Sequence, residues 1–198
     1  MTATRASPHR QLLAYGALGL PLAMAALPVY VHVPRLYAES AGMSLSLLGA
    51  LLLAARLLDA GLDPLLGGWS DRTASRRRLI LLALPCLALG MLALLQPPAV
   101  AVPLWLLASM FCTYFGFSLA SDAYQAWGAE LGRDAGERTR LTASREGFGL
   151  LGVVLAAALP GLLSQDLAQG LAVLAQIFPL LLLLLASWTI FGTPSSVE

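Results

Sequence analysis

Long apolar runs alternate with short polar segments along the whole chain of 198 residues. Each run approaches the roughly 20 residues that an α-helix needs to cross the hydrocarbon core of a bilayer. Turn-forming residues separate several runs, among them Pro34-Arg35, Gln96-Pro97-Pro98 and Ser164-Gln165-Asp166. The pattern predicts six membrane-spanning helices, at residues 11–33, 44–69, 79–95, 102–127, 148–163 and 171–191. The fifth is the shortest, and we expect it to extend backward into the polar segment before it.

Composition supports a membrane protein. Hydrophobic residues make up 58% of the chain and charged residues only 12%, whereas a soluble domain is about 25% charged. The net charge of +1 gives no basic field that would attract nucleic acid. Cys86 and Cys112 lie inside apolar runs, where we expect them to pack as small apolar side chains. The first apolar run has no clean small-residue cleavage site, which favours a retained helix over a cleaved signal peptide.

The basic residues are all arginines, and their placement predicts the orientation of the chain. Arginines precede the first span, and clusters lie between spans two and three and between spans four and five, whereas the opposite connections hold only Arg35. By the positive-inside rule, both termini and the arginine-rich connections face the cytoplasm, which predicts a multi-pass protein of the cell (inner) membrane. Residues 1–10 are then a cytoplasmic N-terminus, residues 11–192 the six-helix domain, and residues 193–198 a cytoplasmic tail.

The second span carries three charges, Arg56, Asp59 and Asp63. Their i, i+3, i+7 spacing places them on one face of a helix. A charge at the bilayer centre costs from about 2.5 to more than 10 kcal/mol, so this face should point into a bundle or a wet cavity. Arg56 neutralises one carboxylate. The other requires a proton, a cation such as Na⁺, or a basic residue from elsewhere; the alternative is a purely structural ion-pair cluster.

Polar and aromatic residues also gather near the end of the fourth span and the start of the fifth. Asp122 and Gln125 are three residues apart and can share a helix face, with Tyr124 beside them. Asp122 and Arg145 are candidates for lining a central cavity, and Tyr124, Gln125 and Arg145 are candidates for binding a solute. For Trp127, a position in the interfacial aromatic belt is an equal alternative.

The segment between spans two and three carries a spaced motif. Gly67-x-x-x-Asp71-Arg72-x-x-x-Arg76-Arg77 resembles the signature between helices two and three of the major facilitator superfamily, with Ala74 and Ser75 replacing a glycine and a basic residue. We expect Gly67 and Gly68 to let helices approach closely. The resemblance implies that this motif takes part in the conformational switch.

Further motifs narrow the resemblance. Arg56-Leu-Leu-Asp59-x-x-x-Asp63-Pro64-x-x-Gly67 is similar to the helix-two motif of the glycoside–pentoside–hexuronide:cation symporters, the melibiose permease-like branch. Segments Glu130-Leu131 to Arg145 and Tyr15-Gly16 to Gly19 also look like that family. The resemblance implies that Asp59 and Asp63 bind the coupling cation, that Asp122 is a third candidate beside the better-aligned Ser121, and that Arg145 contributes to a sugar site. Leu62 and Pro21 depart from the family's asparagine and acidic sugar ligand, so a sugar substrate and Na⁺ do not follow directly.

The resemblance covers residues 11–192 and only the N-terminal half of such transporters, whose sites lie between two six-helix halves. The missing half is expected as a lost C-terminal portion, a separate subunit or a second copy of the chain. The predicted fold class is thus all-α, six transmembrane helices forming one half of a major facilitator superfamily transporter.

The predicted function is secondary active transport: cation- or proton-coupled symport of a small solute, with a sugar or glycoside as the candidate, by alternating access. The alternative is a non-transporting membrane scaffold or regulatory half-transporter subunit. An enzyme is not expected, because Ala55-Arg56 lacks the upstream Asp-Gly of the CDP-alcohol phosphotransferases. We expect no cofactor beyond a coupling Na⁺ or H⁺. With only His9 and His32 as histidines, a transition-metal site is not expected either.

Overall fold

The computed structural model describes residues 8–73 and 75–194, and within them the side chains of all residues except Pro8 and Asp71. All regular elements in these ranges are helices: α1 (Pro8–Ala17), α2 (Gly19–Leu27), the π-helix η1 (Pro28–His32), α3 (Val33–Glu39), α4 (Leu45–Arg72), α5 (Arg76–Leu94), α6 (Val102–Leu131), α7 (Ala135–Leu163) and α8 (Leu167–Gly192). By length and composition, six helical stretches of the described residues can cross a membrane. The all-α fold class and the six spans are confirmed.

The first span is a stack of α1, α2, η1 and α3 that runs from His9 to Glu39. The turn predicted at Pro34-Arg35 is wrong. Pro34 lies in the first turn of α3, where a missing backbone N–H is tolerated because that donor has no partner within the helix. The chain reverses later, at Gly42, whose φ of 64° favours glycine.

The fifth span extends backward as expected, because α7 starts at Ala135. Asp134 is its N-cap, and the Asp134 carboxylate accepts a hydrogen bond of 2.8 Å from the Glu137 backbone N–H. A search for apolar runs misses this start, because the first turns of α7 are polar.

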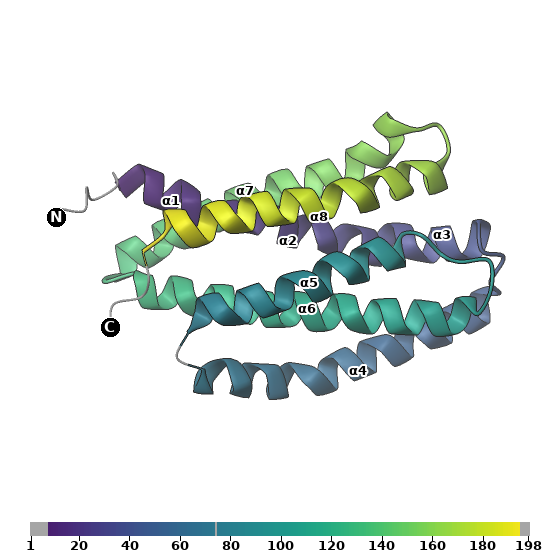
Figure 1. Cartoon of the computed structure of the whole chain (residues 1–198), viewed down its shortest axis with the longest axis horizontal. Coiled ribbons are helices and arrows are strands. Elements are labelled where there is room, and N and C mark those ends of the chain that lie inside the picture. Colours follow the sequence, from purple (N-terminus) through teal and green to yellow (C-terminus); the bar gives the residue numbers. More distant parts are fainter. Residues whose placement is uncertain (1–7, 74, 195–198) are drawn as a thin grey trace.

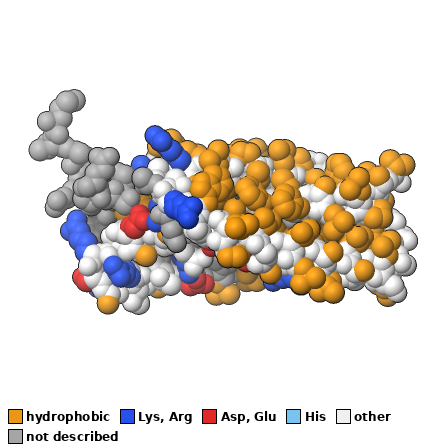
Figure 2. All heavy atoms as spheres, turned by 90° about the horizontal axis from the view of Figure 1, so that it is seen from below, with side chains coloured by type: hydrophobic (Ala, Val, Ile, Leu, Met, Phe, Trp, Pro, Cys, Tyr) orange, Lys and Arg blue, Asp and Glu red, His pale blue; other side chains and the backbone are white. Residues whose placement is uncertain are grey.

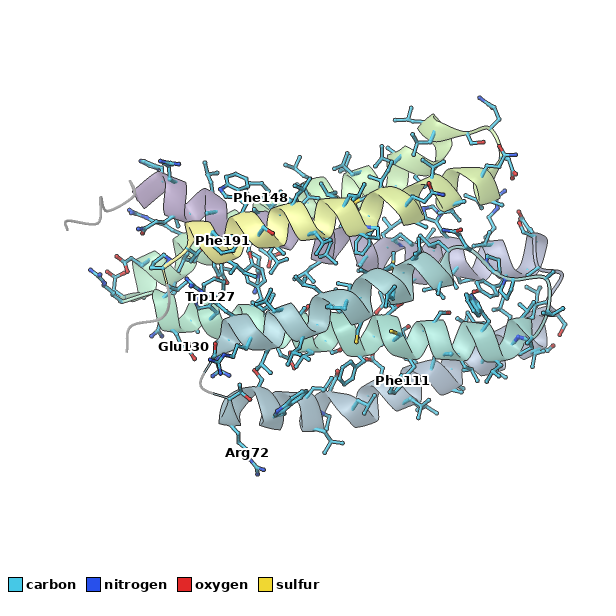
Figure 3. All side chains as sticks on the ribbon, in the orientation of Figure 1. Arg72, Phe111, Trp127, Glu130, Phe148 and Phe191 are labelled. Atoms are coloured by element: carbon cyan, nitrogen blue, oxygen red, sulfur yellow. The ribbon has the colours of Figure 1, made fainter. Side chains whose placement is uncertain are left out.

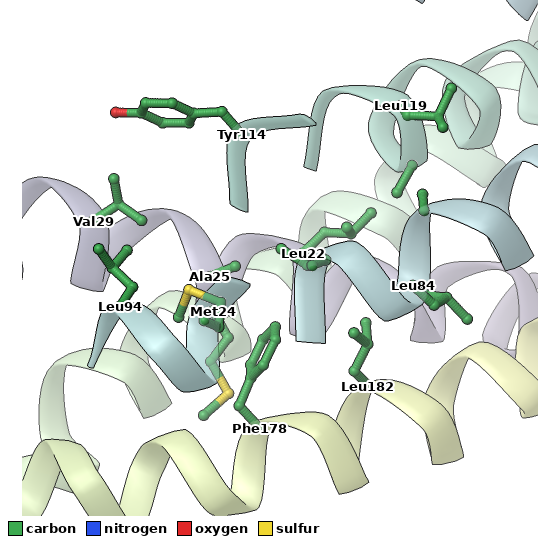
Figure 4. Close-up of a cluster of buried hydrophobic side chains, with 14 of the residues drawn as sticks. Leu22, Met24, Ala25, Val29, Leu84, Leu94, Tyr114, Leu119, Phe178 and Leu182 are labelled. Atoms are coloured by element: carbon green, nitrogen blue, oxygen red, sulfur yellow. The ribbon is translucent and has the colours of Figure 1, made fainter. Parts of the chain in front are cut away.

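The helices pack as two groups that share a core (Figure 1). The first span packs against α7 and α8, α4 and α5 both pack against α6, and α5 contacts α8 across the middle. Buried apolar side chains fill this junction, including Met24 of α2, Leu84 of α5, Leu119 of α6 and Phe178 of α8 (Figure 4). In this arrangement α4 and α7 are the least buried of the six spans.

Both ends of the described chain lie at the same end of the bundle as the α4–α5 and α6–α7 connections, and the other three connections lie at the opposite end (Figure 1). The arginine-rich connections are therefore together. On the face shown in Figure 2, charged side chains gather toward this end and hydrophobic side chains cover most of the remainder. This polarity is what the positive-inside rule requires of a membrane protein.

Glycines allow the closest helix contacts, but not the predicted ones. A Cβ atom at Gly116 of α6 would lie 2.4 Å from the backbone nitrogen of Leu87 in α5. At Gly67 and Gly68, by contrast, no atom of the described residues beyond the adjoining residues and backbone of α4 itself lies within 4 Å of such a Cβ. The expectation that these two glycines bring helices of this chain together is wrong, because the end of α4 stands at the edge of the bundle.

Candidate cation and solute site

An ion pair on α4 forms the centre of the candidate site. Arg56 Nη1 lies 3.0 Å from Asp59 Oδ2, and the side chains are 51% and 11% exposed, respectively. Asp59 is thus covered while the guanidinium reaches outward. A buried carboxylate without a partner would be costly, so the ion pair with Arg56 lowers the free-energy cost of burying Asp59 as an anion.

The fourth span supplies a further oxygen to Asp59. Ser118 Oγ of α6 donates a hydrogen bond of 3.4 Å to Asp59 Oδ1. The sequence reasoning missed Ser118, although a signal was present: Ser118, Ser121 and Asp122 lie at i, i+3 and i+4, a polar stripe on an otherwise apolar span. Asp59 is therefore held from two helices, with a carboxylate and a hydroxyl that are both possible ligands of a hard cation.

Two tyrosines flank Arg56. Its Cζ atom lies 5.0 Å from the ring centroid of Tyr30 in η1 and 5.7 Å from that of Tyr114 in α6. Both distances are within the range of a cation–π interaction, which adds about 0.5–2 kcal/mol each, depending on exposure. Three spans thus meet at Arg56. Sequence reasoning missed both tyrosines, because their register against Arg56 depends on tertiary packing.

Asp63 lies one turn beyond Asp59 on α4 and is exposed. Side chains four residues apart on a helix have Cβ atoms about 6 Å apart, so the two carboxylates repel each other. Among the described residues, no arginine or histidine forms an ion pair with Asp63. The site therefore holds two carboxylates and one guanidinium, an excess of one negative charge.

A hollow lies beside this site between the first and fourth spans. The side chains that line it are mostly small or aromatic: Ala25, Ala26, Val29, Tyr30, Thr113, Tyr114 and Phe117. Tyr30 and Tyr114 belong to both the hollow and the Arg56 environment. A solute in this hollow would contact rings and methyl groups more than charges.

The predicted solute residues differ in their surroundings. Tyr124 is 1% exposed and its hydroxyl donates to the Tyr15 carbonyl, while Tyr15 Oη donates to the Tyr124 carbonyl at 3.2 Å. Tyr124 is therefore closed to a solute in this conformation and joins the first and fourth spans instead. Gln125 is exposed, and Asp122 is half-buried with interaction partners in the fold. Arg145 forms an ion pair of 2.7 Å with Glu146.

Trp127 does not lie in an interfacial belt. It is 1% exposed and packs edge-on against Tyr15, with ring centroids 6.3 Å apart. The guanidinium carbon of Arg77 lies 5.1 Å from the Trp127 ring centroid. The tryptophan is part of the interior at the arginine-rich end, near the start of α5 (Figure 3).

The arginines of the α4–α5 motif tie helix ends together. Arg76 Nε donates to Glu130 of α6 at 2.8 Å, and its Nη1 donates to Ser70 Oγ of α4 at 3.1 Å. Arg77 donates to the backbone carbonyl of Thr193, just after α8. Arg72 is exposed and points away from the bundle (Figure 3). The side chain of Asp71 lies outside the described part of the structure.

A family model described as MFS/sugar transport protein matches residues 12–198. The chain belongs to this family. A comparison with curated proteins finds no match. The family membership confirms the resemblance to the major facilitator superfamily and identifies a multi-pass membrane protein of a transporter family.

The charged site on α4 and the arginine clamp of the α4–α5 motif lie in different parts of the bundle. The charged site of Arg56, Asp59 and Ser118 lies within the spans. The clamp of Arg76, Glu130 and Ser70 lies at one end of the bundle, where α4, α5 and α6 begin or end. A motion that separates these helix ends has to break the clamp.

Proposed function

We propose that this transporter couples movement of a small solute to a monovalent cation or a proton, and that Asp59 and Asp63 hold the coupling ion. The single observation that carries this proposal is the charge balance on α4: Arg56 pairs with Asp59, and the exposed Asp63 stands one turn away. Binding one cation, or one proton, removes the excess negative charge. Ser118 is positioned to add a hydroxyl ligand to Asp59.

The coupling ion is Na⁺ or H⁺ in this proposal. Oxygen ligands suit a hard cation, and two carboxylates with a hydroxyl resemble such a ligand set. The alternative coupling ion is a proton, which binds to one of the two carboxylates. In both cases the bound ion decreases the repulsion between the carboxylates of Asp59 and Asp63 and makes this face of α4 less negative.

The solute site is placed beside the ion site, in the hollow between the first and fourth spans. Tyr30 and Tyr114 link the two, because each ring contacts Arg56 and also lines the hollow. Arg145 and Gln125 contribute to the solute site in another conformation of the transport cycle, and Asp122 stays a third candidate ligand of the coupling ion. In this conformation the hollow has room for about one water molecule, so a sugar or glycoside binds there only after the first and fourth spans move apart. Its C–H faces then pack on the aromatic side chains. Tyr124 is not part of the site in the present conformation.

A second six-helix unit completes the transporter in this proposal. It is supplied by a C-terminal half, a separate subunit or a second copy, and it packs on the faces of α4 and α7, which are the least buried of the spans. Asp63 and Arg56 project from α4 and would then lie between the two units. The termini are placed in the cytoplasm, at the inner face of the cell membrane, because the arginine-rich connections lie at their end of the bundle.

The test is uptake into proteoliposomes. The protein is purified together with its second six-helix unit and reconstituted, and a panel of radiolabelled mono- and disaccharides is offered under an imposed Na⁺, Li⁺ or proton gradient. Coupled transport predicts accumulation with one of these gradients and its loss in Asp59→Asn and Asp63→Asn, both of which still insert. Asp166→Asn, at the N-cap of α8, is the matched control that keeps uptake.

The competing proposal is a non-transporting scaffold or regulatory subunit. It predicts no gradient-dependent uptake of any solute in the panel, while the binding of a partner membrane protein stays intact in Asp59→Asn and Asp63→Asn. Co-purification of that partner with the two variants, compared with the unaltered chain, separates the proposals.

A further inference from the structure

Pro160 leaves a backbone carbonyl in α7 without its usual donor. In an α-helix the N–H of residue 160 would bond to the carbonyl of Ala156, but proline has no N–H. Ala156 is 0% exposed. A buried carbonyl in a membrane protein that lacks a partner is destabilising, because no water is present to replace the missing bond.

His32 of the first span supplies the missing donor. Its Nε2 lies 3.3 Å from the Ala156 carbonyl oxygen, although the two residues are 124 positions apart in the chain. A carbonyl oxygen only accepts, so the proton of the imidazole lies on Nε2 in this arrangement. The bond joins the first span to α7 at the place where the helix ladder of α7 is interrupted.

The same histidine ends a π-helical turn. η1 spans Pro28–His32, and the Val33 backbone N–H bonds to the Pro28 carbonyl five residues earlier. Pro34 has no N–H for the carbonyl of Tyr30, so the regular α-helical ladder cannot continue there. Single π turns inside α-helices are rare and occur frequently at functional sites.

The turn points two side chains in different directions. Tyr30 and His32 are two residues apart, which is about half a helical turn. The Tyr30 ring stands 5.0 Å from the Arg56 guanidinium, whereas His32 contacts α7. Holding His32 in place therefore also holds the orientation of Tyr30.

We propose that His32 is a positioning residue: its hydrogen bond to the carbonyl freed by Pro160 fixes the π turn and thereby keeps Tyr30 against Arg56 of the ion site. The positional part of this proposal, that His32 holds Tyr30 in place, depends only on the contacts of these two side chains. The consequence for ion coupling rests on the proposed transport function.

A double-mutant cycle on purified, detergent-solubilised protein tests the positional part. His32→Ala should lower the apparent Tm by about 2–4 °C, the effect of one lost hydrogen bond. In Pro160→Ala the new N–H at residue 160 satisfies the Ala156 carbonyl, so adding His32→Ala should lower the Tm by much less. Pro85→Ala, at an exposed proline inside α5, is the matched control: there His32→Ala should keep its full effect.

An equal loss of Tm from His32→Ala in the unaltered, Pro160→Ala and Pro85→Ala proteins would overturn the proposal, because it would show that the histidine does not serve the freed carbonyl. His32→Gln is a second test, since its side-chain amide has an N–H near the position of Nε2. It should recover a large part of the lost Tm. Recovery by His32→Leu to the same extent would show that only packing is involved, and would also overturn the proposal.

The consequence for coupling is tested separately by the cation concentration that gives half-maximal uptake. We expect His32→Ala and Tyr30→Leu each to raise it by roughly two- to fivefold, the effect of losing one cation–π contact. The double variant should show no further increase. Absence of uptake in the unaltered protein, assembled with its second six-helix unit, would contradict the proposed function and leave the Tm cycle interpretable; additive effects of the two substitutions would contradict the positioning role.

Discussion

Gly152→Ala should separate the first and fifth spans. A Cβ atom at Gly152 of α7 would lie 2.1 Å from the Leu20 carbonyl oxygen and 3.1 Å from the Met24 backbone nitrogen, both in α2. These are backbone atoms, which cannot rotate away as the end of a flexible side chain can. The methyl group therefore fits only if one helix moves relative to the other.

The size of the effect follows from this geometry. An ordinary van der Waals contact starts at 3.4 Å, so α2 and α7 would have to separate by about 1 Å along a close-packed interface. Overpacking of this kind costs about 1–3 kcal/mol. Alanine favours the helix over glycine by up to about 1 kcal/mol, which offsets part of that cost.

Gly147→Ala is the matched control, since Gly147 lies in the same helix and, beyond the adjoining residues and backbone of α7 itself, no described atom is within 4 Å of the place that its new Cβ would take. Thermal unfolding of both variants in detergent, followed by circular dichroism, is the assay. We expect Gly152→Ala to unfold at an apparent Tm roughly 2–10 °C below that of Gly147→Ala. Equal Tm values for the two variants would refute the close contact between α2 and α7.

Two further predictions concern buried polar contacts. Tyr15→Phe removes the hydroxyl that donates to the Tyr124 carbonyl and should destabilise the chain by about 1 kcal/mol. Tyr30→Phe, at an exposed ring, should cost much less. Denaturation midpoints compare the two variants, and equal midpoints would contradict the buried hydrogen bond. Arg76→Gln and Glu130→Gln should show a coupling energy of about 0.2–1 kcal/mol in a double-mutant cycle, because the pair is partly exposed; strictly additive effects would mean that the α5–α6 clamp contributes nothing.

The spans could be predicted from the sequence because hydropathy measures what the bilayer requires. The common position of the arginine-rich connections could also be predicted, because two spans separate them and an even number of spans returns the chain to the same end of the bundle. The predicted turn at Pro34-Arg35 was wrong because proline is equally compatible with the first turn of a helix. The sequence around Pro34 does not distinguish a turn from a helix that restarts. The start of α7 lay outside the apolar run for a physical reason: helices that leave the hydrocarbon continue with polar residues.

The candidate site was predictable only along one helix. The spacing of Arg56, Asp59 and Asp63 fixes their common face, since helix geometry alone determines it. Ser118, Tyr30 and Tyr114 come from other spans, and their register against α4 is set by packing that no local pattern encodes. The burial of Tyr124 is a tertiary effect of the same kind, because the side chain that fills the position opposite it, Tyr15, is more than a hundred residues away.

An ion site at Asp59 and Asp63 should stabilise the purified chain when its ion binds, and this effect requires neither the solute nor a second unit. The apparent Tm is followed against Na⁺, Li⁺ and pH, with K⁺ at matched ionic strength as the reference, for the unaltered chain, Asp59→Asn and Asp63→Asn. Saturation to about 100 times Kd stabilises by roughly 2.7 kcal/mol, or about 5–10 °C. We predict such a rise with one of these ions and its loss in both variants. The same ion dependence in all three proteins would contradict an ion site at Asp59 and Asp63.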